Sequence, residues 1–239
     1  MSILQHLTRI KYYFAVWNKV YDLRMKVRND GGTVLGNPWK DIDLTDYENH
    51  MSLKNVYQLQ TMNQMMNEQF SSHDAESVMI LGIAGGNGLE HIDKAKFKSV
   101  FGVDINQEYL NECKKRFVAL GDVFKPICVN LLDENLQLPC ADLLVANLLI
   151  EYIGYECFQR VLKRVKPKYI SCIIQINTET SFVSDSPYLH VFDRLDEVHH
   201  QMEESKLIKA MQEIGYTKRM VDEKDLPNGK KLVRLDFVL

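Results

Sequence analysis

The sequence predicts an α/β protein with a doubly wound, mostly parallel sheet that ends in an antiparallel hairpin. From about residue 75, short apolar runs alternate with amphipathic helical segments, which is typical of a parallel sheet covered by helices on both faces. A glycine-rich loop directly follows the first apolar run. Two strand-like runs close the chain, and Pro227-Asn228-Gly229 between them is a turn signal. We therefore expect residues 75–239 to form a Rossmann-like domain.

Five short apolar runs are the expected parallel strands, at residues 78–81, 99–104, 125–129, 143–146 and 169–174. Asn106 can cap the helix that follows the second run, and Gly121 ends that helix. Another helix follows the fourth run and ends at Pro167. Beyond the fifth run, apolar residues at helical spacing predict one long helix over residues 195–211. The hairpin strands are expected at residues 216–221 and 231–239.

Residues 1–74 have a different pattern, and we expect them to form a helical lid over the site. One face of a first helix is apolar, with Ile3, Leu7, Ile10, Phe14, Trp17 and Tyr21. Residues 1–28 also hold six Lys or Arg and one acid, so this helix either binds a partner, a membrane surface or nucleic acid, or packs on the main body. A second helix is predicted over residues 44–70. The segment is too short to bury a core of its own and must lean on the sheet domain.

The composition is that of a globular protein. Of the 239 residues, 46% are hydrophobic and 26% are charged, and the net charge is −3. These values exclude a disordered tail and a disulfide miniprotein. No apolar stretch reaches membrane-spanning length, so we expect no membrane association. None of the five cysteines forms a Cys-x-x-Cys pair, which predicts a reducing, cytoplasmic location.

The loop after the first strand carries the strongest functional signal, Gly82-Ile83-Ala84-Gly85-Gly86-Asn87-Gly88. Glycines let a ligand approach the backbone closely, and this loop lies where ligands bind in doubly wound sheets. The next strand ends in Asp104, whose carboxylate can accept both hydroxyl protons of a ribose. The dinucleotide fingerprint Gly-x-Gly-x-x-Gly and the phosphate loop Gly-x-x-x-x-Gly-Lys are both missing. The residues therefore favour an adenosine ligand without phosphate, S-adenosylmethionine (SAM), and disfavour an NAD-dependent oxidoreductase.

At these residues the chain resembles the class I SAM-dependent methyltransferases, over about residues 75–239. Within that family it is similar to a bacterial group of the small-molecule type. The matching runs are Asn37-Pro38-Trp39, Asp46-Tyr47-Glu48-Asn49-His50-Met51, Gly86-Asn87-Gly88-Leu89-Glu90-His91 and Leu226-Pro227-Asn228-Gly229-Lys230. The resemblance implies methyl transfer with SAM as the cofactor.

The resemblance also implies which residues contact the cofactor. They are Gly82, Ala84, Gly85, Gly86, Asn87, Gly88, Asp104, Ile105, Asn130, Leu131 and Asn147. Asn130 and Leu131 would flank the adenine, and Asn147 would lie near the methionine or the methyl group. The alternative role for Asn147 is a helix cap. A valine at Gly86 is expected to fill space that the cofactor needs.

The chain departs from the family at two positions of this loop. The family commonly has an acid where Gly82 stands and a glycine where Ala84 stands. Without the acid, the methionine amino group loses one partner. The consequence is weaker SAM binding, or a substitute from the N-terminal segment or from Glu90.

Methyl transfer requires few catalytic side chains, because the sulfonium methyl is already activated and alignment of the acceptor supplies much of the effect. We therefore expect no catalytic triad. Glu151 and Tyr152, after the fourth strand, are candidates for a base or an orienting group, or are surface residues. His50 is a further candidate base. Tyr47 and Met51 are expected to face the substrate from the lid, or to pack against the helices of the sheet.

Several metal-ligand side chains gather late in the chain, at His190, Asp193, Asp196, His199 and His200. Oxygen and nitrogen ligands of this kind can hold a divalent ion. Their spacing matches no ligand pattern, so we expect a solvated helix end and no metal site.

The expected function is methyl transfer from SAM to a small-molecule acceptor. The chain has no Asn-Pro-Pro-Tyr run after the fourth strand, which in this family would suggest base or glutamine amino groups. The basic N-terminal helix keeps RNA or protein acceptors open. A non-catalytic protein that binds SAM or a nucleotide is the alternative from another class, because the acid at Gly82 is missing.

Overall fold

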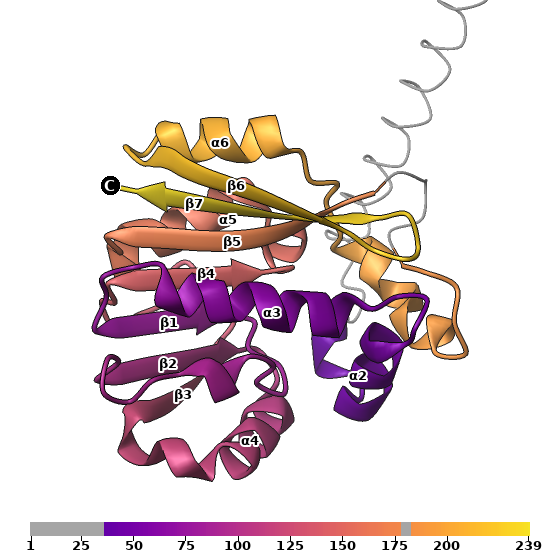
Figure 1. The fold of residues 1–239 in the computed structure, drawn as a ribbon. Coiled ribbons are helices and arrows are strands. Elements are labelled where there is room, and N and C mark those ends of the chain that lie inside the picture. Colours follow the sequence, from indigo (N-terminus) through magenta and orange to yellow (C-terminus); the bar gives the residue numbers. More distant parts are fainter. Residues whose placement is uncertain (1–35, 178–182) are drawn as a thin grey trace, which may run out of the picture. The chain divides into compact units, whose positions relative to one another are not determined.

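The computed structural model describes residues 36–177 and 183–239. Its strands are β1 (Ser77–Leu81), β2 (Ser99–Asp104), β3 (Phe124–Cys128), β4 (Leu143–Asn147), β5 (Tyr169–Ile176), β6 (Thr217–Asp225) and β7 (Lys231–Val238). They form one seven-stranded sheet in the order β3-β2-β1-β4-β5-β7-β6 (Figure 1). Strands β1 to β5 are parallel, which confirms the predicted Rossmann-like sheet.

The C-terminal hairpin completes the sheet with antiparallel strands, as predicted. Strand β7 inserts between β5 and β6, so that Tyr169 faces Val238 and Ile176 faces Lys231. Strand β6 forms the edge, and its charged side chains suit an edge that faces water. The central strands are instead buried on both faces, and Val78, Met79 and Leu81 of β1 are 0% exposed.

The helices are α2 (Leu44–Ser52), α3 (Gln58–Ser71), α4 (Gln107–Arg116), α5 (Ile150–Val165) and α6 (Glu204–Gln212). Short 3-10 helices are η1 (Pro38–Lys40), η2 (Leu89–His91), η3 (Val118–Val123) and η4 (Leu189–Glu197). Helices α3 and α4 share one apolar core with the sheet, and α5 and α6 share the other. Figure 1 shows α3 crossing the sheet at β1, and α2 beside the carboxyl ends of the parallel strands.

The crossover from β1 to β2 differs from a regular doubly wound sheet. It contains only η2, and the crossover from β3 to β4 contains no helix. Helix α3, which precedes the first strand in the sequence, takes the place of a crossover helix and covers β1 with Met62, Met65 and Phe70. Residues 39–239 form one compact unit that includes α2 and α3. The first predicted helix, with its stripe from Ile3 to Tyr21, lies outside the described residues.

Two predicted helices are each broken in two. The single helix expected over residues 44–70 is wrong, because the chain turns at Leu53 and Tyr57 takes a left-handed conformation with φ 53°. The single helix expected over residues 195–211 is also wrong. Leu195 packs in a small cluster with Ile42, whereas the later apolar residues pack in the main core, so the chain separates into η4 and α6.

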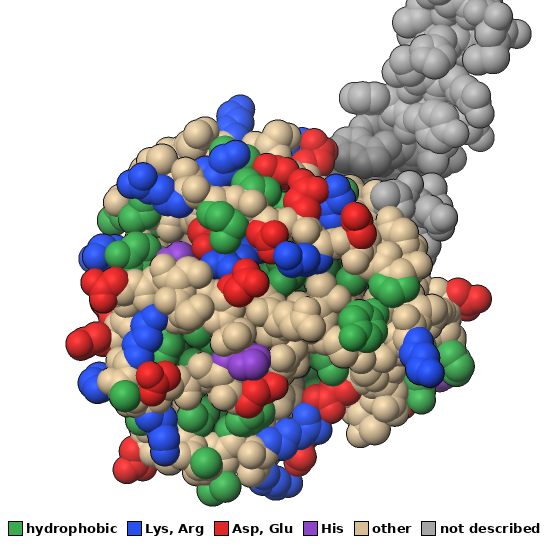
Figure 2. Space-filling view, viewed as in Figure 1, with side chains coloured by type: hydrophobic (Ala, Val, Ile, Leu, Met, Phe, Trp, Pro, Cys, Tyr) green, Lys and Arg blue, Asp and Glu red, His purple; other side chains and the backbone are tan. Residues whose placement is uncertain are grey.

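The surface in Figure 2 mixes both signs of charge, with Lys, Arg, Asp and Glu interspersed. On this face the described residues form no continuous basic stripe, the usual footprint of nucleic-acid binding. Within residues 36–177 and 183–239, no helix has the length and apolar character needed to cross a bilayer.

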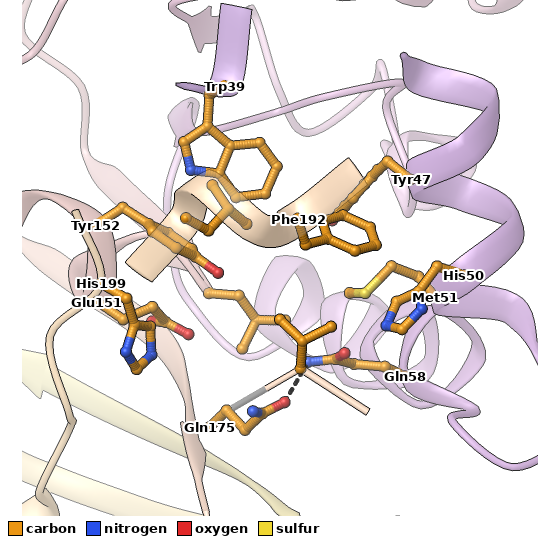
Figure 3. A pocket seen from close by; sticks show the side chains of 13 residues that line it. Trp39, Tyr47, His50, Met51, Gln58, Glu151, Tyr152, Gln175, Phe192 and His199 are labelled. Atoms are coloured by element: carbon orange, nitrogen blue, oxygen red, sulfur yellow. Dashed lines mark hydrogen bonds between the residues drawn. The ribbon is translucent and has the colours of Figure 1, made fainter. Parts of the chain in front are cut away.

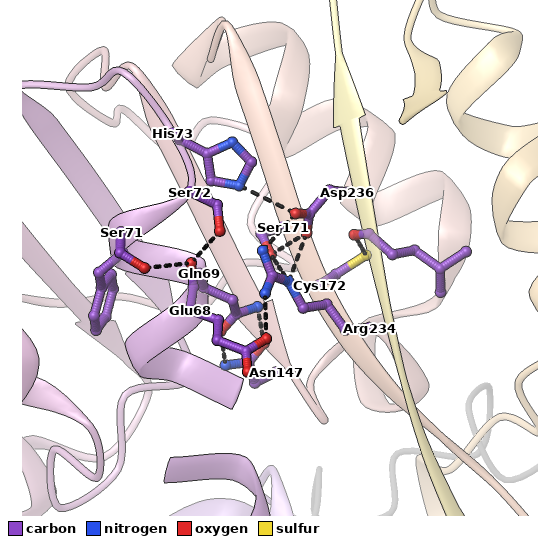
Figure 4. A network of polar contacts seen from close by, with 12 residues as sticks. Glu68, Gln69, Ser71, Ser72, His73, Asn147, Ser171, Cys172, Arg234 and Asp236 are labelled. Carbon is purple, nitrogen blue, oxygen red and sulfur yellow. Dashed lines mark hydrogen bonds and ion pairs between the residues drawn. The ribbon is translucent and has the colours of Figure 1, made fainter. Parts of the chain in front are cut away.

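A buried network of polar side chains fastens the end of α3 to the sheet (Figure 4). Arg234 on β7 is 1% exposed, and its Nη2 lies 2.5 Å from Oδ2 of Asp236. Asp236 also accepts a hydrogen bond from Ser171 and lies 3.3 Å from Nε2 of His73. Nη1 of Arg234 reaches Glu68 on α3. Although burial opposes the shift, the contacts with His73, Arg234 and Ser171 hold the pKa of Asp236 below its usual value.

Candidate functional site

The glycine loop turns sharply between β1 and η2. Ala84 has φ 48° in the left-handed region, which explains why the resembling family commonly has glycine at that position. Gly86 has φ 89°, a conformation that L side chains rarely adopt. The loop therefore passes its backbone, rather than side chains, along the carboxyl edge of the sheet.

Asp104 lies at the end of β2 and is joined to this loop. Its Oδ2 accepts a hydrogen bond from the N–H of Ala84, and its Oδ1 accepts one from the N–H of Asn106, each over 2.9 Å. The side chain of Asn106 caps α4 and so fixes the end of the strand. Burial raises the pKa of Asp104, and the hydrogen bonds from Asn106, Ala84 and Ile105 oppose that shift. These three hydrogen bonds leave one of the four lone pairs of the carboxylate for a further donor.

Two neighbouring glycines of the loop face different parts of the protein. A Cβ at Gly86 would lie 2.6 Å from the ring of Phe117 and 2.7 Å from Sγ of Cys113, both beneath the loop. The expectation that a valine at Gly86 would fill the cofactor's space is therefore wrong, because that side chain would enter the protein core. A Cβ at Gly85 would instead collide with the carboxylate of Glu48.

An ion pair lies against Gly85 and links α2 to α4. Nη1 of Arg116 lies 2.5 Å from Oε1 of Glu48, and Nη2 lies 3.0 Å from Oε2. Nε of Arg116 also bonds Glu112, one turn earlier on α4. This paired contact, which spans 68 positions of the chain, was not predicted from the sequence. It holds helix α2 beside the glycine loop.

The space above the glycine loop is a cavity of about 30 Å³. It is lined by Tyr47, Glu48, Leu59, Met62, Met66, Ile80, Leu81, Gly82, Ile83, Ala84, Gly85, Asn87 and Asn147. Five predicted cofactor residues are thus brought together, namely Gly82, Ala84, Gly85, Asn87 and Asn147. The cavity has room for one or two waters, so a nucleoside-sized ligand requires that side chains move apart.

The other predicted cofactor residues, Gly86, Gly88, Asp104, Ile105, Asn130 and Leu131, do not line this cavity. Asn130 is exposed and accepts a hydrogen bond from the N–H of Leu132, and Leu131 is buried. Their contact with an adenine stays a prediction.

Asn147 forms a reciprocal amide pair with Gln69 of α3. Gln69 donates to Oδ1 of Asn147 over 3.0 Å, and Asn147 donates back over 2.8 Å. The alternative role as a helix cap is wrong, because Leu149 precedes α5 and no side chain caps that helix. Glu90 is exposed and accepts a hydrogen bond from Asn63 of α3.

A second cavity, of about 60 Å³, lies beside the first (Figure 3). It is lined by Trp39, Tyr47, His50, Met51, Gln58, Leu148, Glu151, Tyr152, Gln175, Val183, Phe192, Leu195 and His199. Trp39 packs edge-on against Tyr47 and Tyr152, with ring centroids 5.8 and 4.9 Å apart. All five predicted catalytic and lid residues, Glu151, Tyr152, His50, Tyr47 and Met51, line this cavity. Tyr47 lines both cavities and is the one lining residue that they share among the described residues.

Glu151 brings an acid into this aromatic cavity. It lies on the first turn of α5, which Gly154 offsets from the rest of the helix with φ 74° and ψ 165°. The side chain is 4% exposed, so the alternative of a surface residue is wrong. Oε2 is buried and has no hydrogen-bond partner among the described residues. Burial raises the pKa of Glu151 to about 8, so the carboxyl is mostly protonated at neutral pH.

Two imidazoles face the same cavity. Nδ1 of His50 lies 2.8 Å from Oγ of Ser186 in a hydrogen bond, and the His50 ring packs on Phe192. His199 packs edge-on against Tyr152. Burial, aided by the charge of Lys230, lowers the pKa of His50 to about 4. Burial likewise lowers the pKa of His199 to about 4, so both rings are neutral at neutral pH.

The predicted metal-ligand cluster divides in the structure. His190, Asp193, Asp196 and His200 are exposed, whereas His199 is half-buried and lines the second cavity. For His199 the expectation of a solvated helix end is therefore wrong. Across residues 36–177 and 183–239, no three His, Cys, Asp or Glu side chains are grouped as metal ligands.

Sequence reasoning missed several residues of the two cavities and of the ion pair beside Gly85. Glu48 and Trp39 were noted only within runs that carry the family resemblance, and Arg116 and Phe192 were not singled out at all. Gln58 and Gln175 were missed as well, and their side-chain amides meet in a hydrogen bond of 2.8 Å. The folded chain brings these residues together from six elements, namely η1, α2, α3, α4, β5 and η4.

Comparison with protein-family models gives no match, and no curated protein matches this sequence. Many solved structures do match in fold. N-methyltransferase NodS from Bradyrhizobium japonicum WM9, in complex with S-adenosyl-L-homocysteine (SAH), is 11% identical, with TM-score 0.58, 82% of this chain and 97% of that chain covered. Magnesium protoporphyrin IX methyltransferase from Synechocystis PCC 6803, with bound SAM, is 11% identical, with TM-score 0.54, 91% of this chain and 90% of that chain covered.

The [4+2]-cyclase SpnF also shares the fold, at 8% identity and TM-score 0.56, with 74% of this chain and 80% of that chain covered. The fold therefore does not determine the reaction by itself. Most of the named neighbours are nevertheless methyltransferases. This chain has the fold of the class I SAM-dependent methyltransferases.

Proposed function

We propose that this protein transfers a methyl group from SAM to a small-molecule acceptor. The observation that carries the proposal is the pair of cavities that share Tyr47 as a lining residue. One borders the glycine loop at the carboxyl edge of the sheet, where ligands of doubly wound proteins bind. The other contains an acid and two neutral imidazoles. Methyl transfer needs such an arrangement, because donor and acceptor must meet in line.

The residues beside the glycine loop fit the adenosine part of SAM. Asp104 has one lone pair left for a ribose hydroxyl. No lysine or arginine lines the cavity in the described part of the chain, which suits a cofactor without phosphate. Bound there, SAM would supply a methyl group already activated by the positive sulfur. Neighbours of the same fold were solved with SAM or SAH.

Helix α2 must move for a ligand of that size to enter. The ion pair between Glu48 and Arg116 lies against Gly85 and closes the cavity from above. When that pair opens, the carboxylate of Glu48 becomes available near the position where Gly82 lacks the family's acid. We therefore propose Glu48, rather than Glu90, as the substitute partner for the methionine amino group. In this proposal, residues 1–74 are a lid segment, of which α2 is the moving part.

On the acceptor side, the proposed roles follow from position. Tyr47 lines both cavities and lies nearest to both reactants. Glu151 and His50 are candidates for the group that takes a proton from the acceptor, and Tyr152 forms part of the wall. Met51 supplies apolar lining from α2. We also propose a cytoplasmic location, since none of the five cysteines forms a disulfide.

A second candidate function is binding of SAM without catalysis. The missing acid at Gly82 favours it, because it removes a partner for the methionine amino group. The two functions differ in whether SAM is converted to SAH, since a protein that only binds SAM leaves it unchanged.

The test is formation of SAH from SAM in the presence of a cell extract separated into small molecules, RNA and protein. The proposal expects SAH to form with the small-molecule fraction, and expects Tyr47→Ala to lower the rate at least tenfold. Asn49→Ala, on an exposed position of the same helix, is the matched control and should keep the rate. Turnover with only the RNA or protein fraction would overturn the small-molecule acceptor. Tight SAM binding with no turnover in any fraction would favour the non-catalytic function.

A further inference from the structure

The second cavity has a composition that selects among classes of acceptor. Its lining combines four aromatic rings, two neutral imidazoles and one acid that has an unpartnered oxygen. Building on the proposed methyl transfer, we propose that this cavity binds the acceptor and that the acceptor is a small primary or secondary amine with an apolar body. Glu151 is the group that binds its nitrogen.

The buried carboxyl of Glu151 requires a partner that the protein does not supply. Glu151 is only 4% exposed, and its Oε2 is buried without a hydrogen-bond donor among the described residues. A buried polar group of this kind destabilises the fold unless a ligand provides the missing hydrogen bond. Figure 3 shows the carboxyl of Glu151 directed into the cavity, between Tyr152 and Gln175. An ammonium group would supply the donor, and its positive charge would lower the pKa of Glu151 so that the carboxyl ionises when the amine binds.

The aromatic walls suit the same ligand. Trp39, Tyr47, Tyr152 and Phe192 surround the cavity in Figure 3. Aromatic faces attract an ammonium ion and also cover the apolar body of an amine. An acid among aromatic rings therefore recognises both parts of such a molecule.

The charges around the cavity disfavour an anionic acceptor. No lysine or arginine belongs to its lining within the described residues. Burial keeps His50 and His199 neutral, since it lowers the pKa of each to about 4. A carboxylate or phosphate would therefore find no lysine or arginine in the lining to pair with, since the buried Lys230, whose charge acts on both imidazoles, lies outside it.

Glu151 also allows the nitrogen to become a nucleophile, because its pKa of about 8 makes it a stronger base than either imidazole, whose pKa is about 4. The bound ammonium gives one proton to the carboxylate of Glu151, and the nitrogen regains its lone pair. That lone pair forms the bond to the methyl carbon of SAM while the carbon–sulfur bond breaks and its electron pair stays on sulfur. The products are SAH, the methylated ammonium and the protonated carboxyl of Glu151, so charge and atoms balance. No oxidant or metal takes part in this step.

The test compares three probes that share one body and differ in one group: phenethylamine, 2-phenylethanol and phenylacetate. Their affinities are measured by calorimetry at neutral pH with the full-length protein, with and without SAH. We expect phenethylamine to bind at least tenfold more tightly than the other two. In Glu151→Gln, its affinity should fall about ten- to hundredfold, as for a lost hydrogen bond to a charged group. The affinity for 2-phenylethanol should change less than about twofold, within the range of a neutral contact.

Two variants control for folding. Glu156→Gln changes an exposed acid of the same helix and should leave all three affinities unchanged. Glu151→Asp keeps the carboxyl group and should keep the preference for the amine. Binding of phenylacetate or 2-phenylethanol as tight as that of phenethylamine would overturn the proposal. So would absence of phenethylamine binding, or full amine affinity in Glu151→Gln.

The same titrations separate this inference from the proposed function. If SAH binds to all variants but the amine is not preferred, the amine site is wrong and the cofactor site stands. If the amine binds through Glu151 but SAH and SAM do not bind, the proposed methyl transfer is wrong and the amine site stands.

Discussion

The backbone N–H of Ala84 donates a hydrogen bond to Oδ2 of Asp104 over 2.9 Å. This contact joins the turn after β1 to the end of β2, so the two parts of the proposed adenosine site have a fixed spacing in the protein alone. Ala84 takes a left-handed conformation to make it. Preorganisation of this kind reduces the conformational entropy that the protein loses when a ligand binds.

The two glycines after Ala84 should respond differently to substitution. Gly86→Val should destabilise the fold by about 2–5 kcal/mol, because it combines a positive φ with overpacking against Phe117 and Cys113. Gly85→Ala should cost less than about 1 kcal/mol, since its Cβ meets the flexible end of Glu48. Thermal unfolding of both variants checks this. Equal destabilisation would contradict the described directions of the two residues.

The ion pair between Glu48 and Arg116 should slow the entry of SAM. Its side chains are 24% and 37% exposed, so the pair contributes only about 0.2–1 kcal/mol. Arg116→Gln should therefore speed SAM association by up to about fivefold. Glu112→Gln also removes a partner of Arg116 but leaves the contact at Gly85, and it is the matched control. Stopped-flow fluorescence measures both rates, and an unchanged rate in Arg116→Gln would show that the pair does not close the site.

The buried acid Glu151 should make stability depend on pH. Its pKa is about 8 in the folded protein and 4.5 as a model value, so the folded state holds a proton that the unfolded state loses. The folded state therefore loses stability as the pH rises from 4.5 towards 8, by up to about 1.4 kcal/mol per pH unit.

Glu151→Gln removes this proton linkage. The variant should gain stability over the parent protein as the pH rises across this window. Urea unfolding at several pH values measures the difference. A difference between variant and parent that stays constant with pH would mean that Glu151 is ionised in the folded state.

The network around Arg234 should stabilise the fold rather than the chemistry. Arg234→Leu leaves Asp236 buried without its main cation and should cost about 3–5 kcal/mol at neutral pH. Because the pKa of Asp236 is lowered in the folded state, this contribution is present above its unfolded value and is lost on acidification. The cost of Arg234→Leu should therefore shrink at acid pH. Arg219→Leu, on the exposed face of the edge strand, should change stability by less than about 0.5 kcal/mol.

The elements that the sequence predicted well depend on local signals. Each of these signals lies within one short stretch of the chain. The residues that predict a strand are consecutive, and Asn106 directly precedes the helix that it caps. The fold could be inferred from them because buried parallel strands need continuous apolar residues. The break at Tyr57 could not be inferred, because a tyrosine in a left-handed turn carries no glycine or proline signal.

The contacts that shape the two cavities depend on tertiary structure. Glu48 and Arg116 meet across 68 positions, and nothing near either residue indicates the other. The sequence did single out Tyr47, His50, Met51, Glu151 and Tyr152, which line one cavity. From the sequence, His199 was considered only as a metal ligand, because the cavity that His199 lines forms when η4 packs on α2.

Calorimetry with SAM measures whether the glycine loop and Asp104 bind the cofactor. We expect saturable binding by the parent protein and a loss of about 1.5–3 kcal/mol in Asp104→Ala, since hydrogen bonds to a charged group are removed. Asp122→Ala, at an exposed position beyond α4, should bind as the parent does. Absence of SAM binding by the parent protein, or unchanged affinity in a folded Asp104→Ala variant, would contradict the account.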